Sequence, residues 1–153
     1  MILRERVTIR ATPESVWPWV ADPIRVSQWN PKLIAIDRNA GGPLRLGERF
    51  REIYRMSGRD RESNCEVIEL DAPYLLVVRH RLVDPADRFA DECYRLQATS
   101  DGTRLIQEID LARSGIAWLF QLLMWFLHTT GTPVGKRYLI SLKELVEREL
   151  STE

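Results

Sequence analysis

Hydrophobic and polar residues alternate along much of the chain, which is typical of strands that bury one face of a sheet. The first alternation covers residues 3–10, where Val7 and Ile9 share a face. Later alternations are separated by turn residues, for example Asp101-Gly102. They cover residues 33–39, 48–56, 61–70, 75–82, 89–99 and 104–112. The pattern therefore predicts seven strands, most of them joined by antiparallel hairpins.

A short helix is predicted directly after the first strand. The Thr12 hydroxyl is suited to accept hydrogen bonds from the free amides of a first helical turn, and Pro13 fits a position that needs no N–H. Pro18 lies inside this helix and removes one backbone hydrogen bond. We therefore expect the first helix to be short or bent.

A second short helix is predicted to follow at once. Asp22-Pro23 repeats the arrangement of a capping side chain followed by proline. Pro31 disfavours helical geometry at the residue before it. The second helix should therefore end near Trp29.

Residues 116–127 are apolar on every side of a helix except at Gln121. Twelve residues are too few to span a membrane, and this length is typical of a buried helix or an interfacial segment. Ser114 is positioned to cap the start of such a helix and Gly131 to end it. One interpretation is that the segment plugs one end of a barrel or forms a dimer face. The other is that it gates a hydrophobic cavity or touches a membrane or partner.

A final amphipathic helix is predicted to start at Thr132-Pro133. Its apolar positions recur at helical spacing and should pack into the concave face of the sheet; they are Val134, Tyr138, Leu142, Leu145, Val146 and Leu150. The pattern leaves open whether residues 116–128 form a separate helix or continue into this one.

The motifs at the start of the chain resemble those of the polyketide cyclase/dehydrase and lipid-transport family of the START-like (SRPBCC, Bet v 1-like) superfamily. The shared residues are Pro13-Glu14, Val16-Trp17, Asp22-Pro23 and Trp29-Asn30-Pro31. Weaker agreement extends along the chain, for example at Gly47. The resemblance implies a single START-like domain over residues 1–153 with an α+β helix-grip fold. In that fold a seven-stranded antiparallel sheet curves around a long C-terminal helix, and two short helices follow the first strand.

Composition narrows the classes of partner. The chain of 153 residues has 22 basic and 22 acidic side chains, so it has no general attraction to nucleic acid or to anionic membranes. The first residues lack the basic and apolar segments of a secretory signal, which predicts a cytoplasmic protein. A transmembrane segment is not expected either.

The sequence favours neither a metal nor a cofactor. Cys65 and Cys93 lack Cys-x-x-Cys spacing and are interpreted as ordinary buried or half-buried thiols. The resembled fold places them on strands separated by another strand, too far apart for a disulfide. His80 and His128 are the only histidines, and no third metal ligand is evident. There is no phosphate-binding loop, nucleophile elbow or dinucleotide fingerprint.

Candidate catalytic residues come from the alternation in residues 48–56. Glu52 and Tyr54 share a face with Phe50, whereas Arg49 and Arg51 belong to the opposite, solvent face. A buried carboxylate tends to have a raised pKa that suits acid–base chemistry. Glu52 and Tyr54 are therefore the candidate proton-transfer pair.

Further ligand-binding residues are predicted on the same inner surface. The alternation points Glu92, Tyr94 and Gln107 inward, but it does not decide between Arg79 and His80. The complete predicted ligand-binding set is Phe50, Glu92, Tyr94, Gln107, Trp118, Leu122, Trp125, Tyr138 and Leu142.

The leading functional hypothesis follows from the resemblance together with a mostly apolar interior. It is a carrier or sensor that binds a hydrophobic small molecule, such as a lipid, polyketide or isoprenoid, in an internal cavity. The alternative is a cofactor-independent polyketide cyclase or dehydratase. A third hypothesis is a protein-interaction module that uses residues 116–127. Transient membrane contact and a homodimer both remain open.

Overall fold

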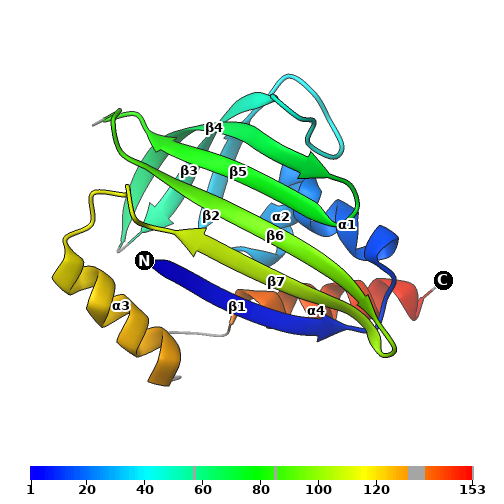
Figure 1. Cartoon of the computed structure of the whole chain (residues 1–153). Coiled ribbons are helices and arrows are strands. Elements are labelled where there is room, and N and C mark those ends of the chain that lie inside the picture. Colours follow the sequence, from blue (N-terminus) through cyan, green and yellow to red (C-terminus); the bar gives the residue numbers. More distant parts are fainter. Residues whose placement is uncertain (57, 85, 131–136, 153) are drawn as a thin grey trace.

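The computed structural model describes residues 1–56, 58–84, 86–130 and 137–152. One seven-stranded sheet dominates the fold (Figure 1), with the strand order β1-β7-β6-β5-β4-β3-β2 and antiparallel pairing throughout. The strands are β1 (Ile2–Ile9), β2 (Leu33–Asp37), β3 (Arg49–Met56), β4 (Arg59–Asp71), β5 (Leu75–Leu82), β6 (Phe89–Thr99) and β7 (Gly102–Asp110). The expected sheet of an α+β helix-grip fold is confirmed.

Two short helices, α1 (Pro13–Ala21) and α2 (Pro23–Trp29), follow β1 as the capping residues predict. The Thr12 side chain accepts from the Ser15 amide, and the Asp22 side chain accepts from the Ile24 amide. Pro18 does not end α1, because the helix continues to Ala21 and the Asp22 N–H donates to the Pro18 carbonyl.

The C-terminal helix α4 (Tyr138–Leu150) packs on the core beside β1, α1 and α2. Leu139, Leu142 and Val146 are fully buried, as expected for an apolar stripe at helical spacing. Leu150, predicted as part of the stripe, is instead 39% exposed, because it lies in the last turn at the end of the chain. The predicted helix start at Thr132-Pro133 lies outside the described residues.

Helix α3 (Trp118–Thr130) lies apart from the sheet (Figure 1) and is separate from α4 in the structure. Trp118 is 74% exposed and Phe120 is 63% exposed, so this segment does not plug one end of a barrel. The dimer face, the other form of that interpretation, stays a prediction. The expected Ser114 cap is also wrong, because its hydroxyl accepts from the Ile116 amide in the turn before the helix. The predicted end at Gly131 lies outside the described residues.

The β6–β7 hairpin requires a glycine where it passes β1. Gly102 has a φ of +125°, which L side chains rarely adopt. A Cβ at this position would overlap the carbonyl oxygen of Ile9. The close approach of this hairpin to the end of β1 therefore depends on the missing side chain.

The two cysteines behave as expected. Cys65 is buried on β4 and Cys93 is half-buried on β6, with β5 between these strands, and both are free thiols. None of the described helices is long and apolar enough to cross a membrane.

Candidate functional site

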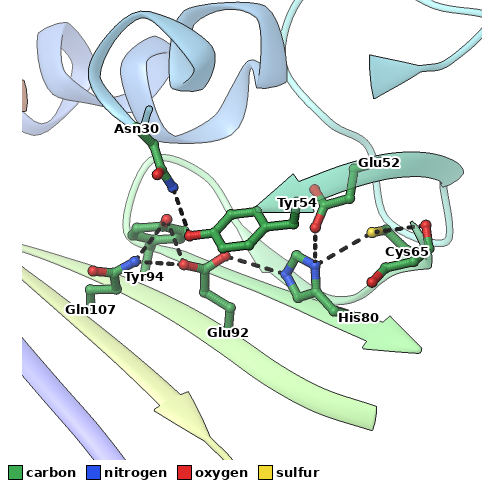
Figure 2. Close-up of polar contacts among 9 residues, drawn as sticks. Asn30, Glu52, Tyr54, Cys65, His80, Glu92, Tyr94 and Gln107 are labelled. Atoms are coloured by element: carbon green, nitrogen blue, oxygen red, sulfur yellow. Dashed lines mark hydrogen bonds and ion pairs between the residues drawn. The ribbon is translucent and has the colours of Figure 1, made fainter. Parts of the chain in front are cut away.

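A cluster of polar side chains lies between the sheet and the end of α2 (Figure 2). The labelled members are Asn30, Glu52, Tyr54, Cys65, His80, Glu92, Tyr94 and Gln107. They come from five consecutive strands of the sheet, β3 to β7, and from the residue that ends α2. The cluster is therefore a product of the whole sheet, not of a local motif.

Strand register brings the centre of the cluster together. Cys65 pairs directly with His80 on one side and with Phe50 on the other, so these three side chains share a face. Glu52 lies two residues along β3 from Phe50, which makes it a diagonal neighbour that a long side chain can reach. Glu92 faces Val78 and is therefore the corresponding diagonal neighbour of His80 on the other side.

His80 is held by Glu52 on one edge of its ring. Its Nδ1 atom lies 2.6 Å from Glu52 Oε1 and 3.4 Å from Cys65 Sγ. Glu52 is only 8% exposed, so its carboxylate depends on partners inside the protein. The close contact with the imidazole supplies such a partner.

The other edge of the ring faces a second carboxylate. His80 Nε2 lies 3.3 Å from Glu92 Oε2, which is an ion-pair distance. Nε2 is nevertheless buried without a hydrogen-bond partner among the described residues. The N–H at Nε2 is thus oriented by the charge of Glu92 but donates no hydrogen bond to another described residue.

Glu92 is fixed by two further donors. The Tyr94 hydroxyl donates to Glu92 Oε1 over 2.8 Å, and the Gln107 side-chain amide donates to the same oxygen over 2.6 Å. Gln107 also contacts the Tyr94 hydroxyl at 3.1 Å. These contacts hold one oxygen of Glu92 and leave the other directed at His80.

Tyr54 connects the cluster to α2. The Asn30 side-chain amide donates to the Tyr54 hydroxyl over 3.2 Å, and Asn30 also accepts from the Lys32 amide. Among the described residues, the Tyr54 hydroxyl proton itself has no acceptor. Burial and the nearby Glu92 charge raise the pKa of Tyr54, so its phenol stays protonated.

The electrostatics of the cluster favour a charged imidazole between two carboxylates. Burial alone would lower the pKa of His80, but the charge of Glu52 and the contacts with Cys65 raise it well above its ordinary value of 6.5. Burial would raise the pKa of Glu92, but the charge of His80 and the hydrogen bonds from Tyr94 and Gln107 lower it below its ordinary value of 4.5. His80 is therefore a proton donor on both edges.

Among the described residues, Glu52, Cys65 and His80 are the only group whose spacing would suit a metal ion. One ligand atom each of Glu52, Cys65 and His80 lies within 4.8 Å of the others. Ligands of tetrahedral zinc lie roughly 3.4 Å apart, given bond lengths of about 2.1 Å. The contact of 2.6 Å between Glu52 Oε1 and His80 Nδ1 is shorter than this and is a hydrogen bond. We therefore interpret the group as a proton-sharing cluster.

The structure brings together five of the residues chosen from the sequence, namely Glu52, Tyr54, Glu92, Tyr94 and Gln107 (Figure 2), and Phe50 pairs with Cys65 on the same face of the sheet. Leu142 is fully buried in the core and Tyr138 is half-buried, with the Lys32 ammonium 5.1 Å from its ring centre. Trp118, Leu122 and Trp125 lie on the exposed α3 helix and not in this cluster.

Sequence reasoning missed the central residue. It left the choice between Arg79 and His80 open, whereas His80 points inward and Arg79 pairs with Asp91 on the opposite face. The direct pairing of His80 with Cys65 would have shown that His80 points inward. That pairing depends on strand register, which a single sequence does not reveal. Asn30 was recognised as a helix end and not as a partner of Tyr54.

One hollow lies on the other face of the sheet, which carries the arginine side chains. It has a volume of about 640 Å³, and its lining includes Arg49, Arg51, Arg79 and Arg81. A second hollow is formed by residues of α3 alone. Neither lies between the sheet and α4, so the apolar cavity expected there stays a prediction.

Comparison with known proteins agrees with this architecture. The family model described as polyketide cyclase / dehydrase and lipid transport matches residues 2–147. No curated protein matches the chain. Among solved structures, a Nitrosomonas europaea protein is 20% identical with a TM-score of 0.70, covering 99% of this chain and 97% of its own. A Mesorhizobium loti protein is also 20% identical with a TM-score of 0.68, covering 97% and 98%. These likenesses concern the fold.

Proposed function

The chain belongs to the polyketide cyclase / dehydrase and lipid transport family, and we propose that it is a carrier or sensor of one hydrophobic small molecule, such as a lipid, polyketide or isoprenoid. Membership of the family implies hydrophobic-ligand binding or cyclase-type chemistry. The observation that carries the proposal is the buried Nε2 atom of His80, which has no hydrogen-bond partner among the described residues. Glu92 attracts this atom by charge at 3.3 Å, and an acceptor on a ligand would supply the hydrogen bond that it lacks.

The surroundings of this atom fit an apolar ligand with one polar group. Phe50, Leu76 and Leu96 are buried on the same face of the sheet as His80, and they would supply apolar contact to a ligand that enters there. A carbonyl or hydroxyl oxygen of the ligand would accept from His80 Nε2, and the Tyr54 hydroxyl is a second donor. These two donors would fix the orientation of the ligand.

A cofactor-independent cyclase or dehydratase is the second candidate, and the placement of His80 between two carboxylates favours it. In a dehydration, Glu52 would take a proton from a carbon beside a carbonyl while the imidazolium gives a proton to the leaving hydroxyl. The C–H and C–O bonds break, a C=C bond forms and water leaves. The Tyr54 phenol, whose proton has no acceptor among the described residues, would stabilise the developing oxyanion.

Exposure to a total lipid and metabolite extract, followed by re-isolation and mass spectrometry, tests the proposal. Recovery of a discrete apolar compound with unchanged mass would support a carrier and identify its ligand class. Recovery of a compound with a defined loss, such as one water, would support the enzyme. If the protein retains nothing from the extract, ligand binding itself is contradicted.

Variants of the cluster separate the two candidates. In an enzyme, Glu52→Gln should abolish turnover yet retain the ligand, and Tyr54→Phe should lower turnover with little loss of binding. In a carrier, His80→Gln should weaken ligand retention roughly tenfold, because a hydrogen bond to a charged donor contributes about 1.5 kcal/mol or more. Glu62→Gln is the matched control, because Glu62 pairs with Arg51 on the outer face.

A further inference from the structure

Helix α3 exposes an unusual amount of apolar side chain. Its exposed residues are Trp118 (74%), Leu119 (61%), Phe120 (63%), Leu122 (51%), Leu123 (50%), Trp125 (47%) and Phe126 (55%). Contiguous exposed patches of this kind mark sites of interaction with proteins or membranes. The core of the domain does not use this surface, so its role must lie in contact with something outside the fold.

The distribution of these side chains around the helix limits what can cover them. At about 100° per residue, the seven residues spread over roughly 220° of the helix circumference. A flat protein surface covers one side of a helix, whereas a helix that lies in a membrane surface buries its whole apolar face in the boundary between headgroups and acyl chains. The two tryptophans, Trp118 and Trp125, are of the type enriched at membrane interfaces.

The charge pattern around α3 points to an anionic surface. Between Asp110 and Glu144 the chain has no acidic residue and four basic ones, Arg113, Lys136, Arg137 and Lys143, of which Lys143 pairs with Glu147 on α4. This local excess stands out in a chain whose total charges balance.

Arginine side chains also lie close together near the connection between β7 and α3. The Arg81 and Arg113 guanidinium groups lie 5.2 Å and 5.7 Å from the ring centre of Phe89. The Arg88 side chain lies against Gly115, three residues before α3 begins. The neighbouring Asp110 is held by the terminal amine of Met1. Arg88 and Arg113 therefore lie near the start of the apolar helix, and Asp84 and Asp87 belong to the same β5–β6 connection as Arg88.

We propose that α3 docks the protein on an anionic lipid surface, with its apolar side chains in the headgroup boundary and the nearby arginines on the lipid phosphates. A helix of 13 residues is about 20 Å long, shorter than the roughly 30 Å of a bilayer core, so it lies in the surface and does not cross it. This inference does not depend on the proposed function, because it concerns a surface remote from His80.

The tryptophans make a selective test possible. Trp17, Trp19 and Trp29 are at most 8% exposed, so of the five tryptophans only Trp118 and Trp125 can report on lipid contact. Vesicles of phosphatidylcholine with phosphatidylglycerol should shift tryptophan emission to the blue, and brominated lipids should quench it. The double variant Trp118→Phe, Trp125→Phe should still bind vesicles and lose this response.

Binding itself is measured by vesicle flotation. Trp118→Ser together with Phe120→Ser should lower the partition coefficient at least roughly tenfold, because both exposed rings lose their burial in lipid. Leu46→Ser is the matched control, since Leu46 is 64% exposed elsewhere and its change should have no effect.

Charge is tested by Arg88→Gln together with Arg113→Gln. Each arginine near an anionic surface contributes about fivefold to binding, so the pair should lower partition into phosphatidylglycerol vesicles by more than about tenfold and leave binding to pure phosphatidylcholine unchanged.

Three results would overturn the inference. One is the absence of binding to either vesicle, and another is equal binding to both. The third is a dimer in ultracentrifugation whose Trp118 and Trp125 are already shielded from acrylamide, because a second copy would then cover α3. Retention of an extract ligand by a protein that ignores vesicles would leave the proposed function intact, and the reverse result would leave docking intact.

Discussion

At the scale of single residues, His80 determines the character of the interior. Its two nitrogens face Glu52 and Glu92, so the three groups together carry one net negative charge when the imidazole is protonated. A neutral imidazole would leave two buried carboxylates without a positive partner, which is unfavourable. The protonated form is therefore part of the folded structure.

This arrangement predicts a specific pH dependence. Because the pKa of His80 is raised on folding, its stabilising contribution is complete below pH 6.5 and is lost as pH rises through the folded pKa. Glu92 has a lowered pKa on folding, so its contribution is complete above pH 4.5 and is lost as pH falls through the folded pKa. Stability should be greatest between these limits and should decline above pH 6.5. Thermal melts across pH 5 to 8 measure the decline, and His80→Gln should flatten it.

Imidazole NMR gives an independent check. The Cε1–H signal that disappears in His80→Gln should titrate with a midpoint well above pH 6.5, since, against the effect of burial, the charge of Glu52 and the contacts with Cys65 raise the folded pKa of His80 well above that value. A titration midpoint near 6.5 for this signal would contradict the proton-sharing cluster.

A metal titration tests the interpretation of Glu52, Cys65 and His80 as a proton-sharing cluster. Because the short contact between His80 and Glu52 is a hydrogen bond, added zinc or a chelator should change the melting temperature by less than about 1 °C. Stabilisation that rises with zinc concentration would show instead that Glu52, Cys65 and His80 open to bind the ion.

At the scale of secondary-structure elements, the hairpin between β6 and β7 is the most constrained connection. Gly102→Ala should cost about 3 kcal/mol, because the methyl group would meet the Ile9 carbonyl and the backbone would be strained. Gly42→Ala is the matched control: its φ is also positive, at +76°, but open space surrounds it, so the cost should be about 1 kcal/mol. Urea unfolding measures both, and equal costs would contradict the close approach to β1.

The elements themselves were largely predictable, because their signals are local. Thr12-Pro13 and Asp22-Pro23 place the starts of α1 and α2, and alternation places each strand within a few residues. The cluster was predictable only in part. Alternation oriented Glu52 and Gln107, but the partners of His80 depend on the register of β4 and β5, where a bulge between Val67 and Glu69 shifts the pairing.

The apolar segment shows a different limit of sequence reasoning. The apolar pattern of residues 116–127 predicts a helix, and it predicts that this helix is unfavourable when fully exposed to water. They do not say whether the protein's own core covers that helix. Only the arrangement of α3 relative to the sheet shows that the core does not (Figure 1).

At the scale of the whole molecule, stability and surface recognition are assigned to different helices. Leu142 of α4 is fully buried between the sheet and the short helices, whereas Leu123 of α3 is 50% exposed. The same substitution therefore distinguishes the two roles. Leu142→Ala should cost about 3 kcal/mol and lower the melting temperature by roughly 9 °C, because it leaves a cavity in the core. Leu123→Ala should shift the melting temperature by less than about 2 °C and weaken vesicle binding. If Leu123→Ala were as destabilising as Leu142→Ala, α3 would be packed on the domain in solution, and its apolar surface would belong to the fold rather than to a membrane.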